Sequence, residues 1–310
     1  MSSPLRVGVV GLGQWGRHHA RIYASLPDVE LTGVVDRNRT ELRGFANRYH
    51  TNGHTDHRDL IGKVDAVSIA VPTALHHAVA RDFLTAGVHV LVEKPITTTV
   101  QEAEELVRLA GRAEVTLLVG HVERFKPAVR RLIELSRDPL FIQARRLRPF
   151  DRTRVMDVGV VMDLMIHDID VVLSVAGGRV ADVGGVGVHI HNSHEDLAVA
   201  HITFAGGCTA WLLASRVSAD KVAEIEVTTA ERAVRLDYHK QQIALHPFGG
   251  EVEQMGIRGD EPLRAELRHF VNCARGLEQP LVSGQDGLRA LEVAHRLLEV
   301  MSVVSSPVRV

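Results

Sequence analysis

The chemistry of the chain is concentrated on one face of a predicted helix over residues 160–176. Four polar residues follow one another there at steps of four, three and four: Asp163, His167, Asp170 and Ser174. Nearly all other positions are apolar, which is typical of a buried helix. Because burying an unpartnered polar group costs about 2–7 kcal/mol, the polar face must meet a polar cleft or partner groups. His167 is suited to take a proton from an alcohol, with Asp163 orienting it. The alternative is a buried Asp–His pair with a structural role only.

A second candidate follows a short apolar run at residues 88–92, where Glu93, Lys94 and Pro95 come next. The run is typical of a central parallel strand, and the proline ends it and fixes the turn. Charged residues at the carboxyl end of such a strand open into the crevice that binds ligands. A lysine there can stabilise the alkoxide that develops as a hydride leaves. The alternative is a surface Glu–Lys pair before a turn.

Near the N-terminus an apolar run leads into the pattern G-x-G-x-x-G. We expect Gly11 to make the tight turn, Gly13 to let the backbone approach a pyrophosphate, and Gly16 to let helix and strand pack closely. The following helix directs its N-terminal N–H groups at phosphates. An acidic residue, Asp36, lies twenty positions after Gly16. This context predicts a dinucleotide site rather than an empty glycine-rich turn.

The acidic residue decides the expected cofactor. Asp36 is expected to accept hydrogen bonds from the adenine-ribose hydroxyls and to repel a 2′-phosphate, which favours NAD over NADP. Arg37 is the counterargument, because it can pair with that phosphate. A later turn places Pro72 and Thr73 at the same sheet edge, although a plain strand-ending turn has this composition too. The residues expected to bind the cofactor are Gly11, Gly13, Gln14, Trp15, Gly16, Asp36, Arg37, Pro72, Thr73, His76, Glu93 and Lys94.

The elements that position these residues change in type along the chain. In the first 120 residues, apolar runs alternate with amphipathic stretches, which indicates a parallel sheet covered on both faces. After the helix at residues 160–176, strand patterns follow one another without helices, which indicates an antiparallel sheet. The sequence thus predicts an α/β fold. Residues 1–121 are expected to form an N-terminal NAD(P)-binding Rossmann domain with a parallel sheet. Residues 122–310 are predicted to form a catalytic and oligomerisation α+β domain with a mainly antiparallel open sheet. The uncovered face of that sheet predicts a homodimer or homotetramer through it.

Composition excludes several classes of partner. The 310 residues are 45% hydrophobic and 24% charged, with a net charge of −2, so neither nucleic acid nor a membrane is expected. No apolar segment is long enough for a membrane span or a secretory signal, so we expect a cytoplasmic location. Two cysteines are too few for a disulfide framework. No metal is expected, because the cluster of His189, His191 and His194 lacks a ligand spacing on one rigid element.

Taken together and in order, these motifs resemble the Gfo/Idh/MocA family of sugar and cyclitol dehydrogenases, and the resemblance covers nearly the whole chain. In that family the lysine of E-K-P and the aspartate and histidine of D-x-x-x-H form the catalytic group. The resemblance therefore implies that Lys94, Asp163 and His167 are catalytic. Many members also have a cis bond before the proline, here Pro95.

A narrower likeness comes from residues 120–128 and 157–170. They resemble the subgroup that oxidises the 3-hydroxyl of UDP-N-acetylglucosamine to a 3-keto product, which is later transaminated in a lipid A-type pathway. The substrate-binding residues implied are His121, Arg124, Arg148, Arg154, Asp163 and His167. A diphosphate needs cationic donors, and the arginines between residues 145 and 154 supply a dense set. Lys126 departs from the asparagine expected there, so that contact is not carried over.

Two other functions stay open. One is the same chemistry on a different polyol, such as inositol or a free hexose. The other is a non-catalytic NAD-binding sensor whose second domain only binds partners. The intact lysine, aspartate and histidine argue against the sensor.

Overall fold

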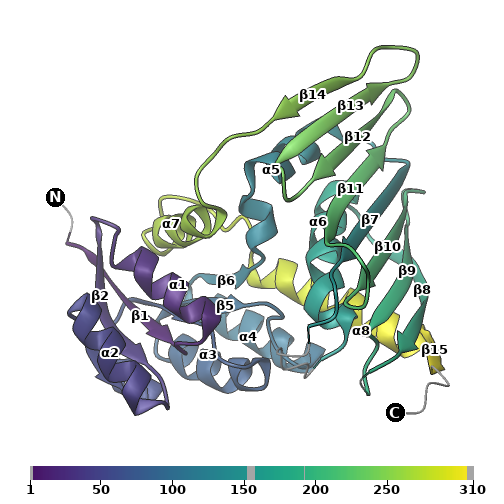
Figure 1. Ribbon diagram of the computed structural model, residues 1–310. Coiled ribbons are helices and arrows are strands. Elements are labelled where there is room, and N and C mark those ends of the chain that lie inside the picture. The colour runs from purple at the N-terminus through teal and green to yellow at the C-terminus, as the bar shows by residue number, and fades with distance from the viewer. Residues whose placement is uncertain (1–2, 152–157, 192, 306–310) are drawn as a thin grey trace. The chain divides into compact units, whose positions relative to one another are not determined.

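The computed structural model describes residues 3–151, 158–191 and 193–305. They form two compact units (Figure 1). The first comprises the residues up to Val122 together with Asp260–Leu288, and the second comprises Glu123–Gly259 and the residues from Arg289 onward.

The first unit is built on a parallel sheet with the strand order β3-β2-β1-β4-β5-β6. Its strands are β1 (Leu5–Val10), β2 (Val29–Val35), β3 (Asn52–His54), β4 (Ala66–Ile69), β5 (His89–Glu93) and β6 (Leu117–Gly120). The helices are α1 (Gln14–Tyr23), α2 (Arg39–Tyr49), α3 (His76–Thr85) and α4 (Val100–Ala113), with short 3₁₀ turns η1 (His57–Leu60) and η2 (Thr73–Leu75). Every residue of β4 and of β6 is buried. Since side chains alternate between the faces of a strand, both faces of the sheet are covered, as predicted.

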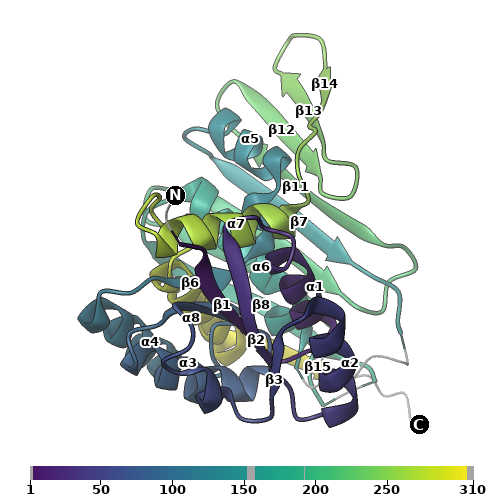
Figure 2. The same ribbon diagram turned by 90° about the vertical axis from the view of Figure 1, so that its left-hand side faces the viewer.

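A helix from late in the chain completes this unit. The apolar side of α7 (Pro262–Ala274) contributes Leu267, Phe270 and Val271 to the core that contains Val7 of β1 and Val34 of β2. Figure 2 shows α7 beside β1 and β2. The sequence-based division placed this segment with residues 122–310, whereas the structure packs it with the first unit. The functional assignment of residues 1–121 and 122–310 stays a prediction.

The second unit is built on a nine-stranded sheet with the order β14-β13-β12-β11-β7-β10-β9-β8-β15. Its strands are β7 (Phe141–Leu147), β8 (Val180–His189), β9 (Leu197–Phe204), β10 (Thr209–Ser215), β11 (Val222–Thr228), β12 (Arg232–Asp237), β13 (Gln242–Pro247), β14 (Glu253–Gly256) and β15 (Ser302–Ser305). Most neighbours are antiparallel, but β10 pairs with β7 and β15 with β8 in parallel. The predicted mainly antiparallel sheet is confirmed.

Helices cover one face of this sheet (Figure 1). They are α5 (Pro127–Leu135), the π-helical segment η4 (Val161–Met165), α6 (Ile166–Ala176) and α8 (Gly284–Val300), which belongs to this unit from Arg289. The short 3₁₀ turn η3 (Val122–Phe125), which begins one residue before the unit, precedes α5 in the chain. The apolar residues of α5, η4, α6 and α8 share one core with the inward-facing residues of the strands. Along β9 and β10 buried and more exposed residues alternate, so the opposite face meets solvent within this unit.

Two helix predictions differ from the structure. The helix expected at residues 160–176 is π-helical over Val161–Met165, because Ile166 N–H bonds to the carbonyl five residues earlier, of Val161. The sequence pattern also predicts a helix over residues 286–304, but α8 ends at Val300, and the β-branched residues Val303 and Val304 that follow lie in β15.

The position of α7 generates a stability prediction. Leu267→Ala empties a fully buried site and should lower the free energy of unfolding by about 2–5 kcal/mol. Hydrogen exchange should rise in β1 and β2 but not in β9 and β10. The control is Leu277→Ala, since Leu277 is 70% exposed. If Leu267→Ala and Leu277→Ala showed the same hydrogen exchange as each other in β1, β2, β9 and β10, the placement of α7 in the first core would be contradicted.

Candidate active site

The glycine-rich turn between β1 and α1 has the geometry of a dinucleotide cradle. Gly11 has φ +92°, and a Cβ there would lie 2.5 Å from the Ala70 carbonyl oxygen; a Cβ on Gly16 would lie 1.8 Å from the Gly11 carbonyl oxygen. These two glycines are therefore required by packing. A Cβ on Gly13 would meet nothing within 4 Å, and Gln14 and Trp15 are exposed. The open space beside Gly13, at the start of α1, fits a pyrophosphate.

Asp36 follows β2 and binds the same turn. Its carboxylate accepts hydrogen bonds from the backbone N–H groups of Leu12 at 2.7 Å and Asn38 at 2.8 Å. Each carboxylate oxygen can accept further bonds, so ribose hydroxyls remain compatible with this arrangement. Arg37 is exposed beside it. The carboxylate is thus fixed where the sequence pattern expects the adenine ribose.

His76, at the start of α3, connects two strand-end turns. Its Nδ1 lies 2.9 Å from the carbonyl oxygen of Pro95, and its Nε2 lies 2.9 Å from that of Val71. The ring is buried, and burial lowers its pKa although both carbonyls act in the opposite sense. The neutral ring donates to one carbonyl at a time. His76 therefore fixes the turn before Pro72 and Thr73 relative to the turn after Lys94.

The E-K-P turn is itself supported by His19, for which the sequence predicts a solvent or phosphate contact but which the structure shows to be buried. The peptide bond before Pro95 is cis. Glu93 Oε1 lies 3.1 Å from Nε2 of His19, a fully buried residue of α1. The only sequence signal for His19 is its place on the buried side of α1, between Gly16 and Tyr23. This contact connects the helix of the glycine-rich turn to the residue before Lys94.

In the second unit, the two predicted catalytic residues lie on either side of the junction between η4 and α6. Asp163 lies in the π-helical segment, and His167 is the second residue of α6. Arg148, just after β7, donates to Oδ2 of Asp163 at 2.7 Å. Segments of π-helix occur often at functional sites. Lys94 belongs to the first unit, so the structure places the three predicted catalytic residues on two units.

Asp168, next to His167, forms a buried ion pair that the sequence did not reveal. Arg146 donates to both of its oxygens, from Nε at 2.9 Å and from Nη2 at 2.7 Å. Arg146 also reaches Glu123 at 3.3 Å, and Lys126 Nζ lies 2.8 Å from the same carboxylate. Burial acts against the charge of Arg146, but the neighbouring carboxylates outweigh it and hold its pKa above the usual range. Burial likewise acts to raise the pKa of Glu123, and the two cations outweigh it.

The arginines between residues 145 and 154, which the sequence predicts to act together on a diphosphate, have different partners in the structure. Arg146 is used in the buried pair, Arg145 pairs with Glu224 at 3.0 Å, and Arg148 pairs with Asp163. Arg152 and Arg154 lie outside the described residues. Of the other predicted substrate-binding residues, Arg124 lies 3.4 Å from Asp170 in the second unit, and His121 is buried in the first.

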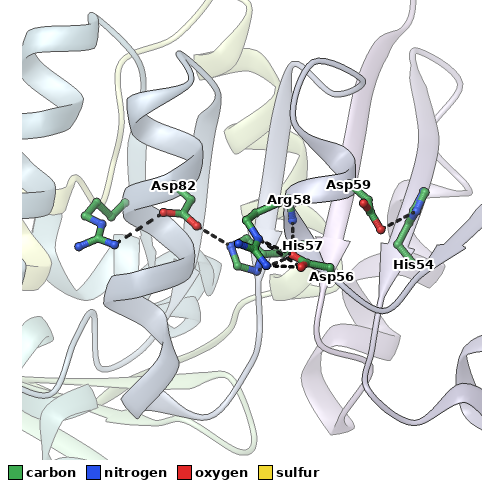
Figure 3. Close-up of polar contacts among 7 residues, drawn as sticks. His54, Asp56, His57, Arg58, Asp59 and Asp82 are labelled. Carbon is green, nitrogen blue, oxygen red and sulfur yellow. Dashed lines mark hydrogen bonds and ion pairs between the residues drawn. The ribbon is translucent and has the colours of Figure 1, made fainter.

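A separate polar cluster follows β3 in the first unit (Figure 3). His57 Nε2 lies 3.0 Å from Asp82 of α3, and Asp56 accepts from both the side chain and the backbone of Arg58. These bonds hold the pKa of the Asp56 carboxyl below its usual range. The contact between His57 and Asp82 joins η1 to α3. Across the described ranges, no group of three or more His, Cys, Asp and Glu side chains is arranged to hold a metal ion.

In the part of the chain that the structure describes, no helix combines the length and apolar character needed to cross a membrane.

Known proteins resemble the chain over nearly its whole length. A family model described as "Oxidoreductase family, NAD-binding Rossmann fold" matches residues 5–121, and one described as "GFO/IDH/MocA C-terminal domain" matches residues 138–235. UDP-N-acetylglucosamine 3-dehydrogenase of Acidithiobacillus ferrooxidans is 34% identical over 300 residues, which cover 94% of this chain and 95% of the relative. The solved structure of that enzyme, GnnA, has a TM-score of 0.92 at 32% identity and covers 97% of this chain and 98% of its own.

An inositol dehydrogenase is a more distant relative. The scyllo-inositol 2-dehydrogenase (NAD(+)) of Bacillus subtilis is 26% identical, over 94% of this chain and 93% of the relative. The family expected from the glycine-rich turn, E-K-P and D-x-x-x-H is confirmed. The chain belongs to the Gfo/Idh/MocA family of oxidoreductases, and its N-terminal domain is of the NAD-binding Rossmann type.

Proposed function

We propose that the protein oxidises the 3-hydroxyl of UDP-N-acetylglucosamine, with NAD as the hydride acceptor. The observation that carries this proposal is the near full-length likeness to a UDP-N-acetylglucosamine 3-dehydrogenase. It is supported by the family's lysine, aspartate and histidine at Lys94, Asp163 and His167. The 3-keto product is a substrate for transamination to a 3-amino sugar. NAD and nucleotide-sugars are both available in the cytoplasm, where we propose that the protein acts.

The three residues have distinct roles in this reaction. His167 takes the proton of the 3-hydroxyl as general base while the hydride leaves the adjoining carbon. Lys94 donates a hydrogen bond to the same oxygen and stabilises its developing negative charge. Asp163, held by Arg148, orients the histidine and the sugar hydroxyl. Bound NAD supplies the hydride acceptor.

Asp36 favours NAD over NADP. Its carboxylate is fixed by Leu12 and Asn38, so it cannot turn aside without breaking two hydrogen bonds. A 2′-phosphate would bring like charge against it. Arg37 beside it is exposed and is the residue that would favour NADP. We therefore infer a preference for NAD.

The proposed roles predict a loss of turnover without a loss of cofactor binding. Lys94→Ala and His167→Ala should each lower the rate of NADH formation from UDP-N-acetylglucosamine by at least about 100-fold, the scale of general acid–base and electrostatic catalysis. The NAD affinity of His167→Ala, measured by calorimetry, should stay within about twofold, because His167 lies outside the Rossmann unit. Lys63→Ala, at an exposed lysine, is the control. Wild-type turnover in either active-site variant would refute the assignment.

A substrate panel separates the proposed function from its rivals. NAD and NADP are each tested with UDP-N-acetylglucosamine, free N-acetylglucosamine and inositol. Activity confined to the nucleotide-sugar supports the proposal, and activity on inositol points to a polyol dehydrogenase like the more distant relative. Tight NAD binding without turnover of any compound points to a sensor.

His76 generates a prediction for cofactor affinity. His76→Phe removes the ring nitrogens that bind the carbonyls of Val71 and Pro95, so the two turns lose their connection. We expect the Kd for NAD to rise about tenfold, which corresponds to about 1.4 kcal/mol. The control is His77→Phe at the next position, where the ring pairs with the partly exposed Glu105 of α4 and not with either turn. A Kd within twofold of the wild type in His76→Phe would contradict this role.

We also propose that the protein is a homodimer or homotetramer formed through the open face of the nine-stranded sheet. Trp211, Val199 and Val186 are 55%, 37% and 43% exposed on this face, and they line a depression of about 310 Å³. Trp211 pairs with His201, and Val199 with Val186, so the apolar residues lie on adjacent strands. A second copy of the same face would cover them symmetrically.

Trp211→Arg should disrupt this assembly, because it replaces the largest apolar side chain of the patch with a charge. Sedimentation at micromolar concentration should shift from dimer or tetramer toward the 34.0 kDa monomer. Phe248→Arg makes the same change at another exposed aromatic residue, after β13, and should leave the mass unchanged. A wild-type protein that sediments as a monomer would refute the proposal.

A further inference from the structure

The first turn of the segment that carries Asp163 is capped by a residue from a distant part of the chain. Glu195 lies just before β9. Its backbone carbonyl accepts from Val160 N–H at 3.0 Å, and its side-chain Oε1 accepts from Val161 N–H at 2.9 Å. The first N–H groups of a helix have no partner within the helix, and a carboxylate there is favoured by charge as well as by hydrogen bonding. Glu195 thus supplies, from 34 residues away, the cap that this segment lacks locally.

The fit between Glu195 and the preceding turn depends on a glycine. A Cβ on Gly159 would lie 2.0 Å from Oε1 and 2.1 Å from Oε2 of Glu195. Only glycine therefore lets the carboxylate lie against this turn. The Glu195 residue is 6% exposed. A carboxylate buried to that extent is costly unless it is hydrogen-bonded, which explains why it is directed at helical N–H groups.

The cap is itself held rigidly by a buried ion pair. Arg216 and Asp196 are 1% and 0% exposed, and Arg216 Nε donates to Asp196 Oδ1 at 2.8 Å. The same guanidinium donates to the carbonyls of Val158 at 2.8 Å and Glu195 at 3.2 Å. Arg216 therefore binds both Glu195, which caps the segment, and Val158, which lies just before the segment in the chain. The position of Glu195 relative to the first turn is set by these bonds.

We propose that Glu195 is a positioning residue for the reaction, acting through the backbone of the segment that carries Asp163 and His167. The inference rests on the proposed function of those two residues. The π-helical segment holds one residue more per turn than an α-helix. If its first turn loses the cap, relaxation to the α-helical register rotates Asp163 by about 100° relative to His167. Its ion pair with Arg148 would then be lost.

Two substitutions at Glu195 separate this role from a general effect on folding. Glu195→Ala removes the cap and should lower kcat about 10- to 100-fold, because Asp163, which orients His167, is moved out of position. The Kd for NAD should stay within about twofold. Glu195→Gln keeps an oxygen that can accept from Val161 N–H and should retain most of kcat. Glu134→Ala removes an exposed carboxylate of α5 and serves as the control.

Gly159 provides an independent test by a double-mutant cycle. Gly159→Ala drives a methyl group into the Glu195 carboxylate and should lower kcat to a similar extent. In the Glu195→Ala background the atoms that the methyl group would meet are gone, so Gly159→Ala should add less than about a twofold loss. Non-additivity of this kind marks residues that act through one contact. Fully multiplicative losses would overturn the proposal.

Hydrogen exchange tests the same idea without relying on turnover. Glu195→Ala should raise exchange in the peptide covering residues 158–167, whereas Glu195→Gln and Glu134→Ala should not. If the wild type oxidises none of the panel compounds, the proposed function fails, yet the exchange result still decides whether Glu195 caps this segment. Unchanged exchange or unchanged kcat in Glu195→Ala would overturn the positioning role.

Discussion

The buried carboxyl of Asp168, adjacent to His167, is held by Arg146, which donates to both of its oxygens, while burial raises the pKa of this carboxyl. A carboxylate buried there without Arg146 would be strongly destabilising, because its charge would have no partner. The pair therefore fixes α6 against β7. Two residues further along the chain, just after β7, Arg148 donates to one oxygen of Asp163 in the π-helical segment. The end of β7 and the residue after it thus contact the helical segment on both sides of His167.

In the Rossmann unit, side chains hold the turns by hydrogen bonds to backbone groups instead of by ion pairs. Asp36 accepts from the glycine-rich turn, and His76 reaches the carbonyls of two further turns. Glu93 in turn contacts the buried His19 of α1. Turns at the ends of parallel strands have backbone groups that neighbouring strands do not bind. Side chains with two polar atoms each connect these turns, so the carboxyl edge of the sheet is held as one surface.

Much of this arrangement was readable from sequence because it is local. The apolar runs at residues 5–10, 66–70 and 88–92 predict strands that agree with β1, β4 and β5 to within one residue at each end. The G-x-G-x-x-G pattern placed Gly11 and Gly16 where packing requires them. The three-residue strand β3 was missed because Asn52–His54 has no apolar pattern. The return of α7 to the first unit and the cap by Glu195 were missed for a different reason. Both depend on partners far away in the chain, which periodicity cannot identify.

The arginines between residues 145 and 154 show how strand geometry limits inference from a run of like charges. Side chains alternate along β7, so Arg145 and Arg146 point to opposite faces of the sheet. Arg145 lies on the exposed face with Glu224, and Arg146 lies on the covered face with Asp168. Neither is available as a member of one cationic site. Among the described residues of this run, Arg148 is the one whose guanidinium contacts Asp163. A run of like charges along a strand is therefore divided between the two faces of the sheet and the residue after the strand, and it does not by itself define one cationic site.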